Sequence, residues 1–171
     1  MTHWAQILPN TGNRGTHSKE RYFLEIRNRY KWLLEMGGER VLLYKRKYTG
    51  TRCPQFDQVR KTNQQHGQDT ICFGTGWVGG YFSPIEIFAS VLTPSPQTAN
   101  IQEMGRRRVY IPTGWTIWEP LLQNGDLIIR QNGQRLWVTE VSQTRWKFFV
   151  LRQNFVTAEV ERNHPVYQLP L

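Results

Sequence analysis

Apolar residues recur at three- and four-residue steps between residues 18 and 37. The positions are Tyr22, Phe23, Ile26, Tyr30, Leu33 and Leu34. This spacing places them on one stripe of an α-helix. Ser18 is a suitable N-cap, Glu20 lies where the helix dipole favours a negative charge, and Gly37-Gly38 ends the pattern. We therefore predict one amphipathic helix over residues 18–37.

Beyond the helix, the pattern predicts strands. Residues 40–48 form a first strand whose far end is strongly basic, as is typical of an edge strand. Residues 81–91 form a second strand, in which Ile85, Ile87 and Ala89 alternate with less apolar neighbours and Pro84 belongs at the strand start or edge. Strand character resumes over residues 106–111.

The last third of the chain contains short strands separated by turns. Asn124-Gly125 and Asn132-Gly133 are both two-residue hairpin signals. The second lies between residues 126–130 and 135–141, which predicts a hairpin. Residues 146–151, 154–160 and 166–169 continue the meander. We predict a mainly β fold, a small barrel or sandwich.

The elements fit one domain over residues 18–171, with an inserted loop over residues 50–80. Residues 1–17 have no apolar period and form a flexible arm. Residues 93–105 make a long connection, and long connections are often functional. Its candidate contact residues are Pro94, Pro96, Gln97, Asn100 and Gln102.

The inserted loop holds both cysteines, Cys53 and Cys72, with eighteen residues between them. A four-cysteine zinc site would need further cysteines where Phe56 and Asp69 stand, so zinc is disfavoured even with His66 nearby. We interpret the cysteines as a structural pair at the loop base. They are either thiols or a disulfide.

Four glycines follow the second cysteine within seven positions: Gly74, Gly76, Gly79 and Gly80. Their segment lacks the Gly-Lys-Ser/Thr ending of a phosphate loop and leads into a strand. Tight turns and close backbone packing explain these glycines better than phosphate binding.

Charge and aromatic content favour an interaction role. Residues 1–61 contain thirteen lysines and arginines but only five acidic residues, whereas the numbers of basic and acidic residues are nearly equal in the rest of the chain. A solvated helix face explains this bias about as well as nucleic acid or an acidic protein does. Seven Trp, seven Tyr and eight Phe suit either a β core or an interface. Candidate basic contact residues are Lys45, Arg46, Lys47, Arg106, Arg107 and Arg108.

The sequence contains no recognisable catalytic motif. The four histidines are scattered, and no serine lies in a nucleophile elbow. We expect no enzyme activity, no cofactor and no bound metal. No apolar stretch is long enough to span a bilayer, so we also expect no membrane association.

Two segments resemble the neck proteins of tailed bacteriophages. The first is Cys53-Pro54 followed by Cys72-Phe73-Gly74-Thr75-Gly76-Trp77-Val78-Gly79-Gly80-Tyr81 and then Pro84-Ile85-Glu86-Ile87. Many such proteins carry four cysteines here; Cys53 and Cys72 match the outer pair, and Phe56 and Asp69 replace the inner pair. The second segment, residues 125–141 with Pro165-Val166-Tyr167, is similar to the barrel of head-closure (stopper) proteins.

The resemblance implies a structural protein of the virion neck, assembled in the host cytoplasm. Copies form a homo-oligomeric ring beneath the portal or adaptor protein and above the tail or terminator protein. The ring closes the head after packaging, and viral genomic DNA passes through its channel without sequence-specific binding. Residues 93–105 are expected to project toward the channel or a neighbouring subunit.

Three alternatives stay open at the sequence level. The chain is an adaptor or a tail terminator of the same neck, or a basic β-barrel that binds nucleic acid. Adaptors are mostly helical, so the dominance of strands favours the stopper. A nucleic-acid-binding barrel requires aromatic and basic residues interleaved on one strand face, for which residues 106–110 are a weak candidate.

Overall fold

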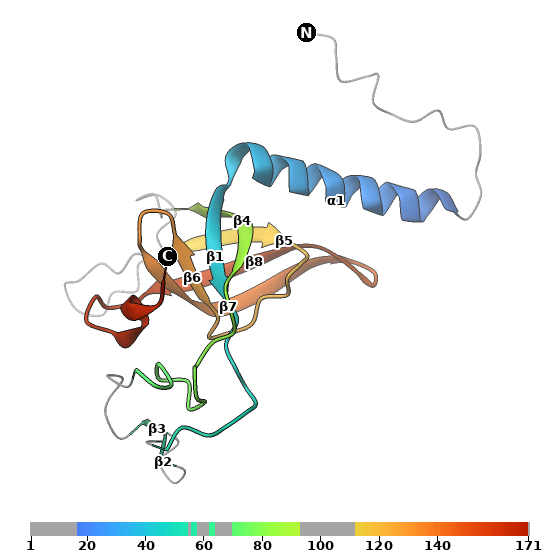
Figure 1. The fold of residues 1–171 in the computed structure, drawn as a ribbon. Helices are drawn as coiled ribbons and strands as arrows, with labels where there is room; N and C mark the ends of the chain where they lie inside the picture. Colours follow the sequence, from blue (N-terminus) through green and yellow to red (C-terminus); the bar gives the residue numbers. More distant parts are fainter. Residues whose placement is uncertain (1–16, 55, 58–61, 64–69, 93–111, 171) are drawn as a thin grey trace, which may run out of the picture.

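The fold is a closed antiparallel β-barrel with one helix beside it (Figure 1). This computed structural model describes residues 17–54, 56–57, 62–63, 70–92 and 112–170. Three predicted segments lie outside these residues: the arm at 1–17 except His17, the connection at 93–105 and the strand at 106–111. The mainly β prediction is confirmed, and the barrel decides between the two architectures that the sequence allowed.

Helix α1 spans His17–Gly37, one residue longer than predicted. The barrel strands are β1 (Glu39–Tyr44), β4 (Ile85–Leu92), β5 (Thr113–Ile117), β6 (Leu127–Arg130), β7 (Arg135–Trp146) and β8 (Phe149–Glu159). They close in the order β1-β4-β5-β8-β7-β6, and every pair is antiparallel. A short hairpin of β2 (Phe56–Asp57) and β3 (Thr62–Asn63) lies within the inserted loop.

The barrel interior is a packed apolar core. It contains Val41, Leu43, Ile87, Ala89, Leu122, Ile128, Leu136, Val138 and Phe155, all buried. A second cluster with Tyr44, Tyr81, Leu127, Ile129, Val160 and Val166 packs against a 3-10 helix, η1 (Pro165–Gln168). Strand β6 is buried on both faces because Ile128 belongs to the first cluster while Leu127 and Ile129 belong to the second.

The edge-strand prediction for residues 40–48 is wrong. Strand β1 ends at Tyr44 and pairs with β4 on one side and β6 on the other. Barrel closure supplies both partners, so the strand has no open edge to protect. The basic residues that suggested an edge follow the strand instead of belonging to it. Similarly, β4 begins at Ile85, and Tyr81 makes only an isolated bridge to Arg46.

Three C-terminal predictions also need correction. Asn124-Gly125 forms a turn but no hairpin, because β5 pairs with β4 and β8, not with β6. The chain turns at Lys147-Phe148, so β7 and β8 are two long strands where shorter ones were predicted at 146–151 and 154–160. Residues 166–169 lie in or next to η1, not in a closing strand, because Pro165 and the capping His164 begin a helical turn there. The hairpin at Asn132-Gly133 is confirmed.

Candidate interaction surfaces

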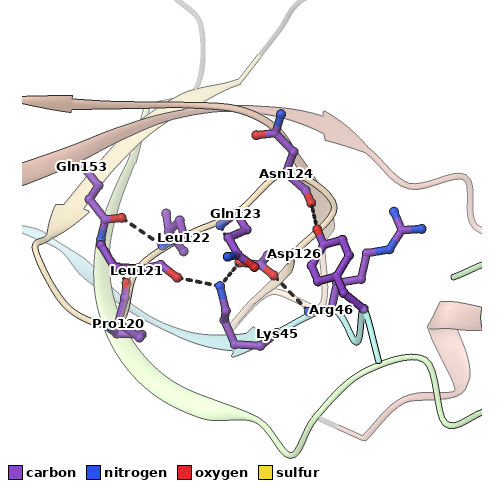
Figure 2. A network of polar contacts seen from close by, with 10 residues as sticks. Lys45, Arg46, Pro120, Leu121, Leu122, Gln123, Asn124, Asp126 and Gln153 are labelled. Atoms are coloured by element: carbon purple, nitrogen blue, oxygen red, sulfur yellow. Dashed lines mark hydrogen bonds and ion pairs between the residues drawn. The ribbon is translucent and has the colours of Figure 1, made fainter. Parts of the chain in front are cut away.

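The inserted loop is fixed to the barrel through the buried carboxylate of Asp126 (Figure 2). Its Oδ2 accepts from Lys45 Nζ at 2.5 Å and from the backbone N–H of Gln123 at 2.8 Å. Its Oδ1 accepts from the backbone N–H of Arg46 at 2.9 Å. Lys45 Nζ also donates to the carbonyl of Leu121 at 2.5 Å. One carboxylate therefore joins Lys45-Arg46, the segment that leads from β1 into the loop, to the β5–β6 connection.

Two further hydrogen bonds hold the segment that leads from β1 into the inserted loop. The Tyr48 hydroxyl donates to the carbonyl of Asn124, and Arg46 Nη2 donates to the carbonyl of Thr75 at 3.3 Å. Burial raises the pKa of Tyr48, although the nearby Arg46 guanidinium opposes the rise, so the phenol keeps its proton at neutral pH. Arg46 and Tyr48 therefore contact both the β5–β6 connection and the glycine-rich return of the loop.

The four glycines of the return all have positive φ angles, from 57° at Gly80 to 82° at Gly76. At Gly80 an added Cβ would lie 2.7 Å from the carbonyl oxygen of Cys72, so a larger residue would meet backbone as well as strain. Tight turns and close backbone approach account for the glycine cluster.

Cys53 and Cys72 are buried, with 3% and 0% of their surface exposed. The Thr75 hydroxyl donates to the carbonyl of Cys72 at 2.7 Å, and the Cys53 N–H donates to the carbonyl of Gly76 at 3.1 Å. These contacts place each cysteine beside the glycine return. The described residues contain no group of three or more His, Cys, Asp or Glu side chains placed to hold a metal ion.

The predicted basic residues have different surroundings. Lys45 is neutralised by Asp126 and has only 19% of its side chain exposed, which makes it unsuitable as a contact residue. Arg46 and Lys47 lie where the loop leaves the barrel and are half-buried. Arg106, Arg107 and Arg108, like the candidate loop residues between Pro94 and Gln102, lie outside the described residues.

Helix α1 packs on the barrel through one side only. Leu34 is fully buried, Tyr30 packs edge-on against Trp115, and Phe23 stacks on Phe149 with 5.3 Å between ring centroids. Arg27 Nε donates to the carbonyl of Val150 at 2.9 Å, and its guanidinium lies over the Trp118 ring. These contacts hold the helix against β5 and the end of the β7–β8 hairpin.

The neighbouring side of α1 and the hairpin tip expose an apolar surface. We call it the α1–hairpin surface; it consists of Tyr22, Trp32, Leu33, Met36, Trp146 and Phe148. Phe148 is 95% exposed and Met36 71% exposed. Tyr22, Leu33 and Met36 share one side of the helix because their separations are close to whole turns. Phe23 joins the two parts, since its ring also approaches that of Trp146.

The sequence pattern does not predict this surface, for two reasons. The apolar period of the helix includes Tyr22 and Leu33 in the packed stripe, whereas they are 60% and 49% exposed. The pattern also predicts Trp146 and Phe148 within one strand, whereas a turn separates β7 from β8 there. The alternation of polar and apolar residues over Arg145-Trp146-Lys147-Phe148 breaks at Phe148-Phe149, and this break is the signal in the sequence for a turn here.

The arrangement defines a small closed β-barrel with a helical extension, an anchored loop and an exposed aromatic surface. No protein-family model matches the chain, and no curated protein matches it. Within the described part of the chain, no helix has the length and apolar character needed to cross a membrane.

Proposed function

We propose that this chain is a structural protein of the tailed-bacteriophage neck. Its copies form a ring below the portal or adaptor protein, close the DNA-filled head and join it to the tail. In this proposal the protein assembles in the host cytoplasm and ends in the virion. The resemblance of the cysteine–glycine segment to neck proteins supports this class of protein. The α1–hairpin surface supports contact between copies.

The observation that carries the proposal is the exposure of large aromatic side chains on the α1–hairpin surface. Phe148 and Trp146 are 95% and 55% exposed at the tip of a long hairpin, with Trp32 58% exposed on the adjacent helix. Large apolar side chains exposed together on a protein surface mark protein–protein contacts, and aromatic residues dominate their energetics. We infer that this surface contacts the next copy of the chain.

The closed barrel favours contacts through side chains. All six barrel strands have partners on both sides, so the barrel offers no edge for strand addition. A contact between two different patches of successive copies closes into a ring when the rotation allows. The formal net charge of +9 suits the passage of DNA through such a ring without sequence-specific binding.

Residues 106–110, the sequence candidate for nucleic-acid binding, lie outside the described part of the chain. Within the described part, strands β5 and β8 offer a candidate surface for this alternative. Trp115 and Arg152 lie side by side there. However, the Arg152 guanidinium lies over the Trp115 ring at 5.7 Å and over the Tyr30 ring at 5.6 Å. Bases stack on open aromatic faces, so these mutual contacts favour the structural role. Adaptor and terminator roles in the same neck remain the closest alternatives.

The test measures self-association of the purified chain and of Phe148→Ser by light scattering and negative-stain microscopy. We expect the native chain to form rings as concentration rises and the variant to stay monomeric. Its free energy of unfolding should change by less than about 0.5 kcal/mol, because the side chain is exposed. Leu121→Ser is the matched control. Leu121 is 53% exposed, like the residues of the α1–hairpin surface, but it lies on the β5–β6 connection, where its carbonyl accepts from Lys45.

A native chain that stays monomeric at every accessible concentration would contradict self-contact through the α1–hairpin surface. Equal loss of association in the Phe148 and Leu121 variants would show that exposed apolar area alone, and not this surface, drives association.

A further inference from the structure

A small groove lies between the last turns of α1 and the barrel. We call it the α1–β4 groove. Its apolar lining consists of Leu34, Ile85, Ile87, Phe88, Ile117 and Pro120, and its volume is about 190 Å³. Ile85 is 42% exposed, so solvent reaches this lining. A cavity of about 150 Å³ can hold one benzene molecule, so the groove has room for one aromatic side chain.

Acidic side chains also line the α1–β4 groove. They are Glu35, Glu86 and Glu119, accompanied by Lys31, and all four are exposed. Glu35 lies 3.9 Å from Lys31, and Glu86 lies 3.6 Å from Arg40. Glu119 forms no ion pair within the described part of the chain. The groove therefore combines apolar side chains with an excess of negative charge, although the whole chain is strongly basic.

The tip of the β7–β8 hairpin has the complementary character. Figure 1 shows the hairpin extending past the other barrel strands. Strand β5 pairs with β8 only as far as Arg152, so the tip, residues 145–150, lies beyond β5. Phe148 is 95% exposed there, and the cations Arg145 and Lys147 are exposed beside it. Neither cation forms an ion pair with any residue that the structure describes.

We propose that the hairpin tip of one copy inserts Phe148 into the α1–β4 groove of the next copy. Resting on the proposed oligomeric ring, this contact assigns the two patches that meet between neighbours. Phe148 packs on the apolar lining, and Arg145 and Lys147 approach the glutamates. Because the tip and the groove are different patches, each copy uses its tip on one neighbour and its groove on the other, as a closed ring requires.

Two other contacts between copies fit less well. If two tips met, Arg145 and Lys147 of both copies would come together, and these like charges repel. A second groove, along β1 and β6, has a volume of about 330 Å³, but two arginines line it, Arg40 and Arg130, against Glu86 alone. These arginines have the same sign of charge as the tip. Charge therefore favours the α1–β4 groove.

The test mixes two variants, each of which lacks one of the two patches. Phe148→Ser removes the aromatic side chain of the tip and keeps the groove. Ile85→Lys places a cation in the groove and keeps the tip. Val78→Lys is the matched control for Ile85→Lys, since Val78 is 39% exposed but lies on the inserted loop. Light scattering and analytical ultracentrifugation measure association, and urea unfolding checks that each variant is folded.

We expect both variants to stay monomeric alone at concentrations where the native chain and Val78→Lys form rings. Their equimolar mixture should form dimers and nothing larger, because one intact tip enters one intact groove and the other two patches are disabled. Leu121 follows Pro120 in the chain but does not line the groove, so Leu121→Ser should leave ring formation unchanged.

Charge reversal in the otherwise native chain is a second test and does not depend on Ile85→Lys. Glu119→Lys and Lys147→Glu should each raise the concentration needed for ring formation about fivefold, as expected for one exposed charge pair made repulsive. The double variant keeps the native net charge and should return that concentration to within about twofold of the native value. Net charge alone predicts instead that Lys147→Glu strengthens association, because it lowers the repulsion between copies.

Three results would overturn the tip–groove contact while leaving the oligomeric ring in place. Dimers of Ile85→Lys alone would mean that two tips meet. A mixture that stays monomeric while the native chain forms rings would mean that other patches are in contact. Stronger association of Lys147→Glu would show that net charge dominates. A native chain that is monomeric at every concentration would instead contradict the ring itself.

Discussion

A single carboxylate links segments that are far apart in the sequence. Asp126 is fully buried and accepts hydrogen bonds from Lys45, Arg46 and Gln123. A buried carboxylate is stable only when it is paired and its oxygens are hydrogen-bonded. Asp126 meets both conditions, so it determines where the inserted loop leaves the barrel.

We predict that Asp126→Asn lowers the free energy of unfolding by about 3 kcal/mol, because it leaves Lys45 without its counter-charge. Urea unfolding measures the change. Glu86→Gln is the control, since Glu86 pairs with Arg40 at 3.6 Å while both side chains are more than half exposed. The control should change stability by less than about 0.5 kcal/mol. Equal effects in the two variants would contradict the role of Asp126.

A pH dependence is expected from His164. Its Nδ1 accepts a hydrogen bond from the N–H of Val166 and begins η1, and its ring packs edge-on against Trp137. Burial lowers the pKa of His164, although Glu161 opposes the shift. The unfolded chain therefore takes up this proton at higher pH than the folded chain does, so stability falls as pH drops through about 6.5.

We predict that His164→Asn reduces this loss of stability between pH 8 and pH 5.5. Asn keeps an oxygen that can cap η1 but does not titrate. Urea unfolding of both proteins at several pH values gives the two slopes. Parallel slopes would exclude His164 as the source of the difference.

At the scale of elements, the β5–β6 connection depends on one residue of β8. Gln153 is fully buried; its Nε2 donates to the carbonyls of Ile117 and Pro120 at 2.8 and 2.9 Å. Its Oε1 accepts from the N–H of Leu122 at 2.9 Å. The connection therefore obtains its backbone hydrogen bonds from a side chain and not from a neighbouring strand.

We predict that Gln153→Leu lowers the free energy of unfolding by about 3 kcal/mol. Leucine has a similar size but cannot hydrogen-bond, so three backbone groups are left unsatisfied. Hydrogen exchange of residues 118–126 should accelerate more than that of β6. Gln143→Leu, on the half-exposed part of β7, is the control and should have little effect. Uniform acceleration along the chain would instead indicate global destabilisation alone.

At the scale of the whole molecule, two different surfaces lie on opposite sides of one barrel. The α1–hairpin surface is aromatic, and on the inserted loop Lys47 and Arg52 lie over the rings of Phe82 and Trp77. Their separation means that substitutions on one should leave the other unchanged.

The sequence by itself determined the elements that local physics controls. The period of the apolar residues gave α1 to within one residue, and Asn132-Gly133 gave the β6–β7 hairpin. The glycines of the loop return could also be interpreted from the sequence, since their conformations are local. In each case the deciding interactions lie within a few residues of one another.

Only the tertiary structure decided which surfaces are free. The sequence placed Tyr22 and Leu33 in the core stripe, because a helical period shows which residues share a side but not how wide a barrel face covers them. It placed β1 at an edge and Asn124-Gly125 in a hairpin, because strand partners come from segments remote in the chain. Burial and pairing depend on what the rest of the chain brings alongside, and no local pattern contains that information.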